Sequence, residues 1–337
     1  MRHVLETLIA ALERGESAIL GTIVRSSGSA PRTSGARMVV LPDGSLTGSV
    51  GGGALEGACQ AEAGKLLADA RTFTQLDFSL SAEMAAEQGM VCGGSVTVLL
   101  QKLEPAAAAL FRALESAYSA GRRPLLFTVL PSDSAPPRLL TLGAGEDDQV
   151  PAALRQSLQG RNERAAFTVS HEGLDIFVEP LVHPGIVHLV GAGHVALATA
   201  HIAAFAGFEV VVMDDREEFA NTARYPEARE VRVLDSFNNC LTGLGPDDYV
   251  VIVTRGHMHD REVLAQALRT GAGYIGMIGS RRKRQAVFTY LLGEGFRETD
   301  LERVHNPIGL PIGADTPEEI GVSIVAEMIQ VRAQAGK

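Results

Sequence analysis

The fold of the second half of this chain is decided by the stretch IVHLVGAGHVA at residues 186–196. It reads as a short apolar strand, a turn at Gly191-Ala192-Gly193-His194, and the start of an Ala-rich helix. Glycine permits a tight turn and close approach of the backbone to a phosphate, and Ala196 still lets the helix pack on the strand. The free N–H groups and positive dipole end of the helix favour an anion. The stretch therefore predicts a Rossmann-type unit.

Two acidic residues follow where such a unit places its ribose-binding acid. The next apolar run, at residues 209–213, ends in Asp214-Asp215, about 20 residues after the glycine turn. An acid at this point disfavours a 2′-phosphate, so NAD is expected in preference to NADP if a dinucleotide binds. A Rossmann fold that binds another ligand, or none, is the alternative that the residues leave open.

The order of strand-like and helix-like patterns predicts two domains. From Ile186 onward the two patterns alternate, which is typical of a parallel sheet covered by helices. The first half mixes helices, strands and a hairpin, and its region 132–162, rich in Pro, Ser, Gly and Asp, is expected to form variable loops. We therefore predict an α/β protein with an N-terminal α/β domain at 1–183, subdivided near residue 104. A Rossmann-type parallel-sheet domain is predicted at 186–337.

Composition excludes several classes of partner. Of the 337 residues 46% are hydrophobic, and the formal net charge of −10 at pH 7 argues against a nucleic-acid partner. Three cysteines in a chain of this length do not form a disulfide framework. No run reaches the roughly 18 apolar residues that span a bilayer, and the N-terminus reads as an amphipathic helix rather than a signal segment. We expect a cytoplasmic protein without a nucleic-acid or membrane partner.

Two glycine-rich loops of the first half are candidate ligand contacts. Gly51-Gly52-Gly53 lies between a predicted strand and a predicted helix, and a backbone that approaches an anion closely would explain three glycines there. Cys92-Gly93-Gly94 leads into an apolar strand, where a thiolate suits a soft metal or a sulfur atom. The alternative for Cys92 is a small buried thiol, which is also what we expect of Cys59 and Cys240.

Further candidates follow two predicted strands of the second half. The segment TRGHMHD at 254–260 is interpreted as a phosphate or substrate contact, a metal site, or a helix cap in which Arg255 pairs with Asp260. The segment SRRK at 280–283 opens a predicted helix and is either an anion contact or a solvated basic face. From these residues alone, an NAD-dependent oxidoreductase with His257 as the acid or base is one hypothesis.

Taken together, these motifs resemble the xanthine dehydrogenase accessory protein family, XdhC and CoxI. The first-half motifs are GSAPR at 28–32 with Gly35, GSVGGGALE at 48–56 and CGG at 92–94. The second-half motifs are GAGH at 191–194, DDR at 214–216, TRGH at 254–257, IGS at 278–280, PIGL at 307–310, IGA at 312–314 and TPEEI at 316–320. Any one piece is unspecific, but the set is specific and covers both ends of the chain.

The resemblance implies a maturation factor rather than a catalyst. Such a protein binds and protects molybdenum cofactor (molybdopterin), supports its sulfuration with a cysteine desulfurase, and inserts it into an apo-xanthine dehydrogenase-type molybdoenzyme. A homodimer is also implied. Ala54 stands where some relatives carry cysteine, which leaves Cys92 as the only loop thiol and the candidate metal ligand. The implied cofactor-binding residues are Gly51, Gly52, Gly53, Glu56, Cys92, Gly93, Gly94, Gly191, Gly193, His194, Asp214, Asp215, Arg255, His257, Ser280 and Arg281.

Overall fold

The chain divides into two compact units, Met1–His183 and Pro184–Lys337, which we describe separately. The computed structural model describes residues 2–28, 34–80, 94–132, 135–145, 150–159, 161 and 163–334. Within these ranges, no helix is both long enough and apolar enough to cross a membrane.

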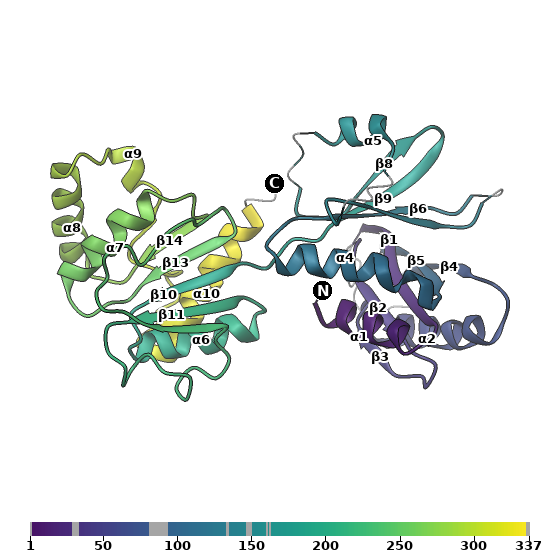
Figure 1. Ribbon diagram of the computed structural model, residues 1–337, viewed down its shortest axis with the longest axis horizontal. Helices are drawn as coiled ribbons and strands as arrows, with labels where there is room; N and C mark the ends of the chain where they lie inside the picture. Colours follow the sequence, from purple (N-terminus) through teal and green to yellow (C-terminus); the bar gives the residue numbers. More distant parts are fainter. Residues whose placement is uncertain are drawn as a thin grey trace. The chain divides into compact units, whose positions relative to one another are not determined.

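The first unit begins with an antiparallel five-stranded sheet between two layers of helix (Figure 1). In β1, Ile19 and Ile23 face a core shared with α2, while Ala18 and Leu20 face a core shared with α1 and α4. Both faces of β1 are therefore apolar, as expected for a strand covered on two sides. In sheet order the strands are β3 (Leu46–Gly48), β2 (Arg37–Val40), β1 (Ala18–Gly28), β5 (Gly94–Leu103) and β4 (Phe73–Leu80). The helices are α1 (Arg2–Glu13), α2 (Gly53–Ala68) and α4 (Ala108–Ser119), the last preceded by the 3₁₀ turn η1 (Pro105–Ala107).

A second, four-stranded antiparallel sheet completes this unit. Its order is β7 (Arg138–Leu142), β6 (Leu125–Val129), β9 (Leu174–Pro180) and β8 (Phe167–His171), with the short helix α5 (Ala152–Ser157) packed on it. The prediction of loops throughout 132–162 is wrong, because this region contains β7 and α5. Leu140 and Leu154 are buried in a core that the surrounding Pro, Ser and Gly residues obscure in the sequence.

The two sheets of the first unit are joined by a buried ion pair. Arg37 of β2 donates from Nε to Oε1 of Glu179 of β9 at 2.9 Å, and its Nη2 also pairs with the carboxylate. Both side chains are almost fully buried, at 2% and 3% exposed. Burial raises the pKa of Glu179, and the charge of Arg37 and its hydrogen bond oppose that rise.

The second unit is built on a parallel six-stranded sheet, which confirms the Rossmann-type prediction. Helices α6 and α10 cover one face and α7 and α8 cover the other (Figure 1). Alternate residues of each strand serve the two cores; Val250 packs toward α7, for example, and Val251 toward α10. The strands in sheet order are β12 (Glu230–Val233), β11 (Glu209–Asp214), β10 (Ile186–Val190), β13 (Asp248–Ile252), β14 (Tyr274–Met277) and β15 (Val304–His305). The helices are α6 (His194–Phe205), α7 (His257–Leu268), α8 (Arg281–Gly293), α9 (Glu298–Leu301) and α10 (Pro317–Gln334).

A buried carboxylate of helix α10 connects this helix to β14 and β15. Oε2 of Glu327 accepts hydrogen bonds from the Tyr274 hydroxyl at 2.5 Å and from the Gly309 amide at 2.9 Å. Its Oε1 lies 3.2 Å from Nδ1 of His305. One side chain of α10 thereby holds β14, β15 and the loop that follows β15.

Candidate functional site

The glycine turn lies at the switch point of the parallel sheet. The strand order is β12-β11-β10-β13-β14-β15, so the strands that follow β10 in the chain are added on one side of it and those that follow β13 on the other. Ligands of such sheets bind at the carboxyl ends of the two strands between which the order reverses, here β10 and β13. Gly191 follows β10 with φ 105°, and a Cβ atom there would lie 2.4 Å from the carbonyl oxygen of Val253. Glycine is required because the loop passes directly against the end of β13.

The next glycine, Gly193, has no such packing reason. Its φ is −74°, and a Cβ atom there would meet nothing within 4 Å. It is the N-cap of α6, and no side chain caps this helix in the described part of the chain. His194 is the exposed first residue of the helix. The helix therefore offers an open N-terminus, which is suited to an anion.

Asp214 is turned inward and holds the glycine turn. It is 2% exposed, and its Oδ2 accepts the amide of Ala192 at 2.8 Å. Arg216 donates to the same carboxylate from its amide, Nε and Nη2 at 2.8–3.0 Å. Burial raises the pKa of Asp214, but the hydrogen bonds from Arg216 and Ala192 outweigh it, so the pKa is lowered overall. Asp214 therefore stabilises the glycine turn, and the hydroxyl groups of a ribose would have to compete with these donors for its carboxylate oxygens.

Asp215 is the more accessible of the two acids. Its side chain is 22% exposed, and its Oδ2 receives Nη2 of Arg255 at 3.1 Å. Its Oδ1 has no hydrogen-bond partner among the described residues, although Nε of Arg216 lies 3.8 Å away. Asp215 is thus the more exposed acid of this pair, although its unpartnered Oδ1 is itself closed off from solvent.

Of the three alternatives for segment 254–260, the helix cap in which Arg255 pairs with Asp260 is not the arrangement found. Arg255 reaches the end of β11 instead, through Asp215, while Asp260 is fully buried in the first turn of α7. Asp260 accepts the Thr254 hydroxyl at 2.6 Å and forms an ion pair with Lys283 of α8. Burial raises the pKa of Asp260, and the bonds from Lys283 and Thr254 oppose that rise. The strand order, which the local sequence does not reveal, decides these pairings.

The first turn of α8 divides the basic run between the protein and solvent. Ser280 is the N-cap, and its Oγ accepts the amide of Lys283 at 3.3 Å. Lys283 turns toward Asp260, and Arg284 lies over the ring of Phe288 at 4.9 Å. Arg281 is exposed. Sequence reasoning missed the role of Lys283, because its ion pair with Asp260 depends on which strands are neighbours.

Most candidate residues of the second half lie together at the carboxyl edge of the parallel sheet. His257 begins α7 at this edge, but its side chain lies outside the described residues. His259, the neighbouring candidate metal ligand, packs against Phe237 with the ring centroids 4.8 Å apart, and the described residues contain no group of three or more His, Cys, Asp or Glu suited to a metal. The residues that follow β10, β11, β13 and β14 at the carboxyl edge are Gly191, Gly193, His194, Asp214, Asp215, Arg255, Ser280 and Arg281.

The triple-glycine loop of the first unit is already bound to a carboxylate. Oε1 of Glu56 accepts the Ser49 hydroxyl and the amides of Val50, Gly51 and Gly52, the last at 2.9 Å. The hydrogen bond from Ser49 is the main cause that lowers the pKa of Glu56, and the loop amides add to it. The positive φ angles of the loop explain its glycines. An external anion would have to displace Glu56.

The cysteine loop is only partly described. Cys92 and Gly93 lie outside the described residues, and Gly94 begins β5 opposite Gly28 and Leu80. Burial raises the pKa of Cys59 and of Cys240 to about 11, so both thiols are protonated at neutral pH.

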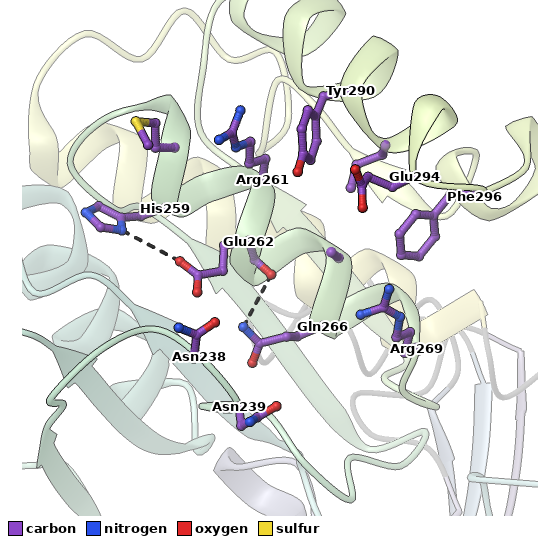
Figure 2. Close-up of a pocket in the computed structure, with 13 residues that line it drawn as sticks. Asn238, Asn239, His259, Arg261, Glu262, Gln266, Arg269, Tyr290, Glu294 and Phe296 are labelled. Atoms are coloured by element: carbon purple, nitrogen blue, oxygen red, sulfur yellow. Dashed lines mark hydrogen bonds and ion pairs between the residues drawn. The ribbon is translucent and has the colours of Figure 1, made fainter.

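A surface groove of about 400 Å³ runs along α7, and His259 is the one described candidate residue that lines it. Figure 2 shows α7 between Asn238 and Asn239 on one side and Tyr290, Glu294 and Phe296 on the other. Several of its polar side chains contact one another: His259 lies 3.9 Å from Glu262, and Arg261 lies over the ring of Tyr290 at 4.2 Å. The groove is therefore distinct from the carboxyl edge.

Sequence comparison matches both units to one family. Residues 11–79 match the XdhC and CoxI family, and residues 187–328 match the XdhC Rossmann domain. Both matches agree with the family that the motifs resemble.

Three relatives extend this comparison. A Bacillus subtilis protein described as a probable subunit of xanthine dehydrogenase is 27% identical over 96% of each chain. The molybdenum cofactor insertion chaperone PaoD of Escherichia coli is 24% identical over 98% of this chain and 88% of its own. The E. coli protein YqeB is 37% identical over 44% of this chain, but the match spans only 27% of its length.

A solved structure matches over almost the whole chain. It is a crystal structure from Bacillus halodurans, described as a xanthine dehydrogenase, with a TM-score of 0.81 and 25% identity. The match covers 99% of this chain and 96% of that one.

Proposed function

Because this chain belongs to the XdhC and CoxI family, we propose that it binds molybdenum cofactor and inserts it into a xanthine dehydrogenase-type molybdoenzyme. The observation that carries the proposal is the similarity over nearly the full length to PaoD, a protein named as a molybdenum cofactor insertion chaperone. In this role the cofactor is cargo, and the chain needs groups that hold it reversibly rather than groups that transform it.

The carboxyl edge of the parallel sheet supports this role. The open N-terminus of α6 at Gly193 and His194 would hold the phosphate of the cofactor, with the exposed Arg281 adding positive charge at the same edge. The partly exposed carboxylate of Asp215 would accept a hydrogen bond from the pterin ring. Glu56, by contrast, occupies the amides of the Gly51–Gly53 loop, so that loop does not fit a phosphate while Glu56 is in place.

Sulfuration and partner binding belong to the same proposal. Cys92 is the candidate thiolate ligand of the molybdenum, and a cysteine desulfurase would supply the sulfur. Homodimerisation in the cytoplasm is part of this proposal, and light scattering on the purified chain tests the dimer.

A variant at Gly193 tests the proposed cargo site. Gly193→Asp places a carboxylate where the phosphate would bind, at a position where Asp is a favourable N-cap, so folding should be retained. We expect at least a tenfold loss of molybdopterin, measured by fluorescence of the pterin released on denaturation, and a matching loss of apo-enzyme activation. Gly64→Asp, at an exposed glycine of α2 with open space around it, is the charge-matched control. Equal loading of both variants would contradict the placement.

An NAD-dependent oxidoreductase is the second candidate function. The strand order with β10 beside β13, together with the Gly191–Gly193 turn, favours it. The two candidates differ in the molecule that co-purifies and in their dependence on Cys92. Molybdopterin that is lost in Cys92→Ala supports the chaperone. Stoichiometric reduced nicotinamide with turnover, unaffected by Cys92→Ala, supports the oxidoreductase instead.

A further inference from the structure

A second cavity of the Rossmann unit lies along one face of α6. It encloses about 330 Å³, within the range of small-molecule sites. Leu197, Ala198 and His201 of α6 form one wall, the segment 224–228 another, and Pro317 and Glu318 of α10 a third. Asp214, Asp215 and Arg255 are not among its lining residues, but His194 is, so the cavity adjoins the carboxyl-edge site at the first turn of α6.

Two neighbouring residues of this cavity carry hydrogen-bond donors that meet no acceptor. Nε and Nη2 of Arg224 and the hydroxyl of Tyr225 are closed off from solvent and have no hydrogen-bond partner among the described residues. Tyr225 is only 3% exposed. Burial raises its pKa to about 12, against the opposing influence of Arg224, so the hydroxyl keeps its proton. A guanidinium only donates and cannot accept that proton. What these donors lack is a hydrogen-bond acceptor.

The charges around the cavity point to an anion. Arg216 and Arg224 both lie over the ring of Phe219, at 3.8 and 5.0 Å, but within the described part of the chain only Arg216 is matched by a carboxylate, that of Asp214. Glu227 is engaged with His201 at 2.9 Å. The remaining acid of the wall, Glu318, is exposed, where solvent screens its charge.

The first turn of α6 borders the same cavity. His194 is both the first residue of the helix and a lining residue, and no described side chain caps this end. The helix end adds a partial positive charge to that of Arg224. The rest of the wall is largely apolar, with Leu197, Ala198 and Pro317, and suits a flat or apolar body attached to the anion.

We propose that this cavity binds a phosphate monoester of the nucleoside monophosphate class through Arg224, Tyr225 and the first turn of α6. The phosphate supplies the acceptors that the three buried donors lack, and the apolar wall receives the body of the ligand. The site does not rest on the proposed function, although both use the first turn of α6: Gly193→Asp affects a phosphate bound in either site, whereas changes at Arg224 and Tyr225 address this cavity alone.

Calorimetric titration of the full chain tests the proposal, with AMP, inorganic phosphate and adenosine as probes. We expect AMP to bind, adenosine to bind at least tenfold more weakly, and Arg224→Gln and Tyr225→Phe each to weaken AMP about tenfold or more. Arg297→Gln, at an exposed arginine of the segment before α9, is the matched control and should bind AMP as the unchanged chain does.

A second measurement separates binding from folding. Tyr225→Phe removes a buried hydroxyl that has no partner among the described residues, so the unliganded variant should melt at the same temperature as the unchanged chain or higher, while its affinity for AMP falls. If inorganic phosphate binds but AMP does not, and both variants lose phosphate binding, the anion site is supported. Its ligand is then phosphate and not a nucleoside monophosphate. If the same two variants also lose molybdopterin loading, the phosphate that this cavity binds is that of the pterin. The proposal is overturned if neither AMP nor phosphate binds at millimolar concentration, or if both variants bind within twofold of the unchanged chain.

Discussion

The N-terminus of α2 already holds a carboxylate, whereas that of α6 holds none from the described residues. Oε1 of Glu56 accepts the amides of Gly51 and Gly52 together with the Ser49 hydroxyl, while Gly193 leaves the first turn of α6 open. At the scale of single residues, the two glycine loops therefore differ in function. One positions its own acid, and the other is free to receive an external anion.

Replacing Glu56 by Gln tests the first of these loops. The variant keeps the shape but loses the charge, so we expect the amides of residues 50–52 to exchange with deuterium about fivefold faster at pH 7. Because hydrogen bonds from Ser49 and the loop hold the pKa of Glu56 below 4.5, its stabilisation is complete above pH 4.5. It is lost as pH falls through the folded-state pKa, where the two proteins should converge. Glu62→Gln on the same helix is the control, and equal exchange in both variants would contradict the prediction.

A pair of alanine substitutions tests the glycine turn of the second unit. Gly191→Ala should destabilise the unit by roughly 2 kcal/mol or more, because φ is 105° and the new Cβ would meet Val253 at 2.4 Å. Gly193→Ala meets open space, and should change stability by less than about 1 kcal/mol, the cost of losing an adequate N-cap. Thermal unfolding followed by circular dichroism measures both. A larger loss in Gly193→Ala would reverse the assignment.

At the scale of elements, the loops that follow β13 and β14 are joined by Asp260 and Lys283. The fully buried carboxylate of Asp260, in the first turn of α7, receives the Thr254 hydroxyl and the Lys283 ammonium from α8. These contacts fix the starts of two helices at the carboxyl edge. They also turn Lys283 away from solvent and leave Arg281 facing it.

Lys283→Met tests this connection between helices. It leaves a buried carboxylate without its cation, and we expect a loss of about 3–5 kcal/mol at pH 7. Burial raises the pKa of Asp260 above its ordinary 3.8, and without Lys283 it should rise further. A raised pKa favours the folded state as the group takes up a proton, so the deficit should shrink as pH falls from 7 toward 5. Urea unfolding at several pH values measures this; a deficit that is independent of pH would refute the charge-based explanation.

The elements that could be predicted from sequence are those with strong periodicity. The parallel sheet, the turn at Gly191–Gly193 and the acid pair at the end of β11 follow from local patterns, and the structure has each of them. β7 and α5 could not be predicted, because they are short and lie among Pro, Ser and Gly residues. The partners of Arg255, Asp260 and Lys283 could not be predicted either, because they depend on which strands are neighbours.

At the scale of the whole molecule, each unit depends on a buried carboxylate that joins distant segments. In the first unit, Glu179 of β9 and Arg37 of β2 connect two sheets, 142 residues apart in the chain. In the second, Glu327 of α10 holds Tyr274 of β14, 53 residues earlier. Both contacts are specific tertiary links rather than local ones.

Arg37→Met tests the link between the sheets of the first unit. The substitution leaves Glu179 buried without its partner, so we expect about 3–5 kcal/mol of destabilisation in urea unfolding. The double variant Arg37→Met, Glu179→Leu removes both charges and should recover most of the loss. A double variant no more stable than the single one would show that the pair stabilises the unit through its hydrogen bonds and not merely by mutual neutralisation.

The position of Glu327 in α10 has a consequence for biosynthesis. The ribosome releases β14 long before α10, so Tyr274 and the α6 face of the sheet wait for partners that are translated much later. The first unit has all of its core residues by His183 and can begin to consolidate while translation continues. A nascent chain interrupted before Glu327 would therefore carry an assembled first unit and an unfinished second one, in which the part of the sheet that α10 covers is exposed to chaperones and proteases.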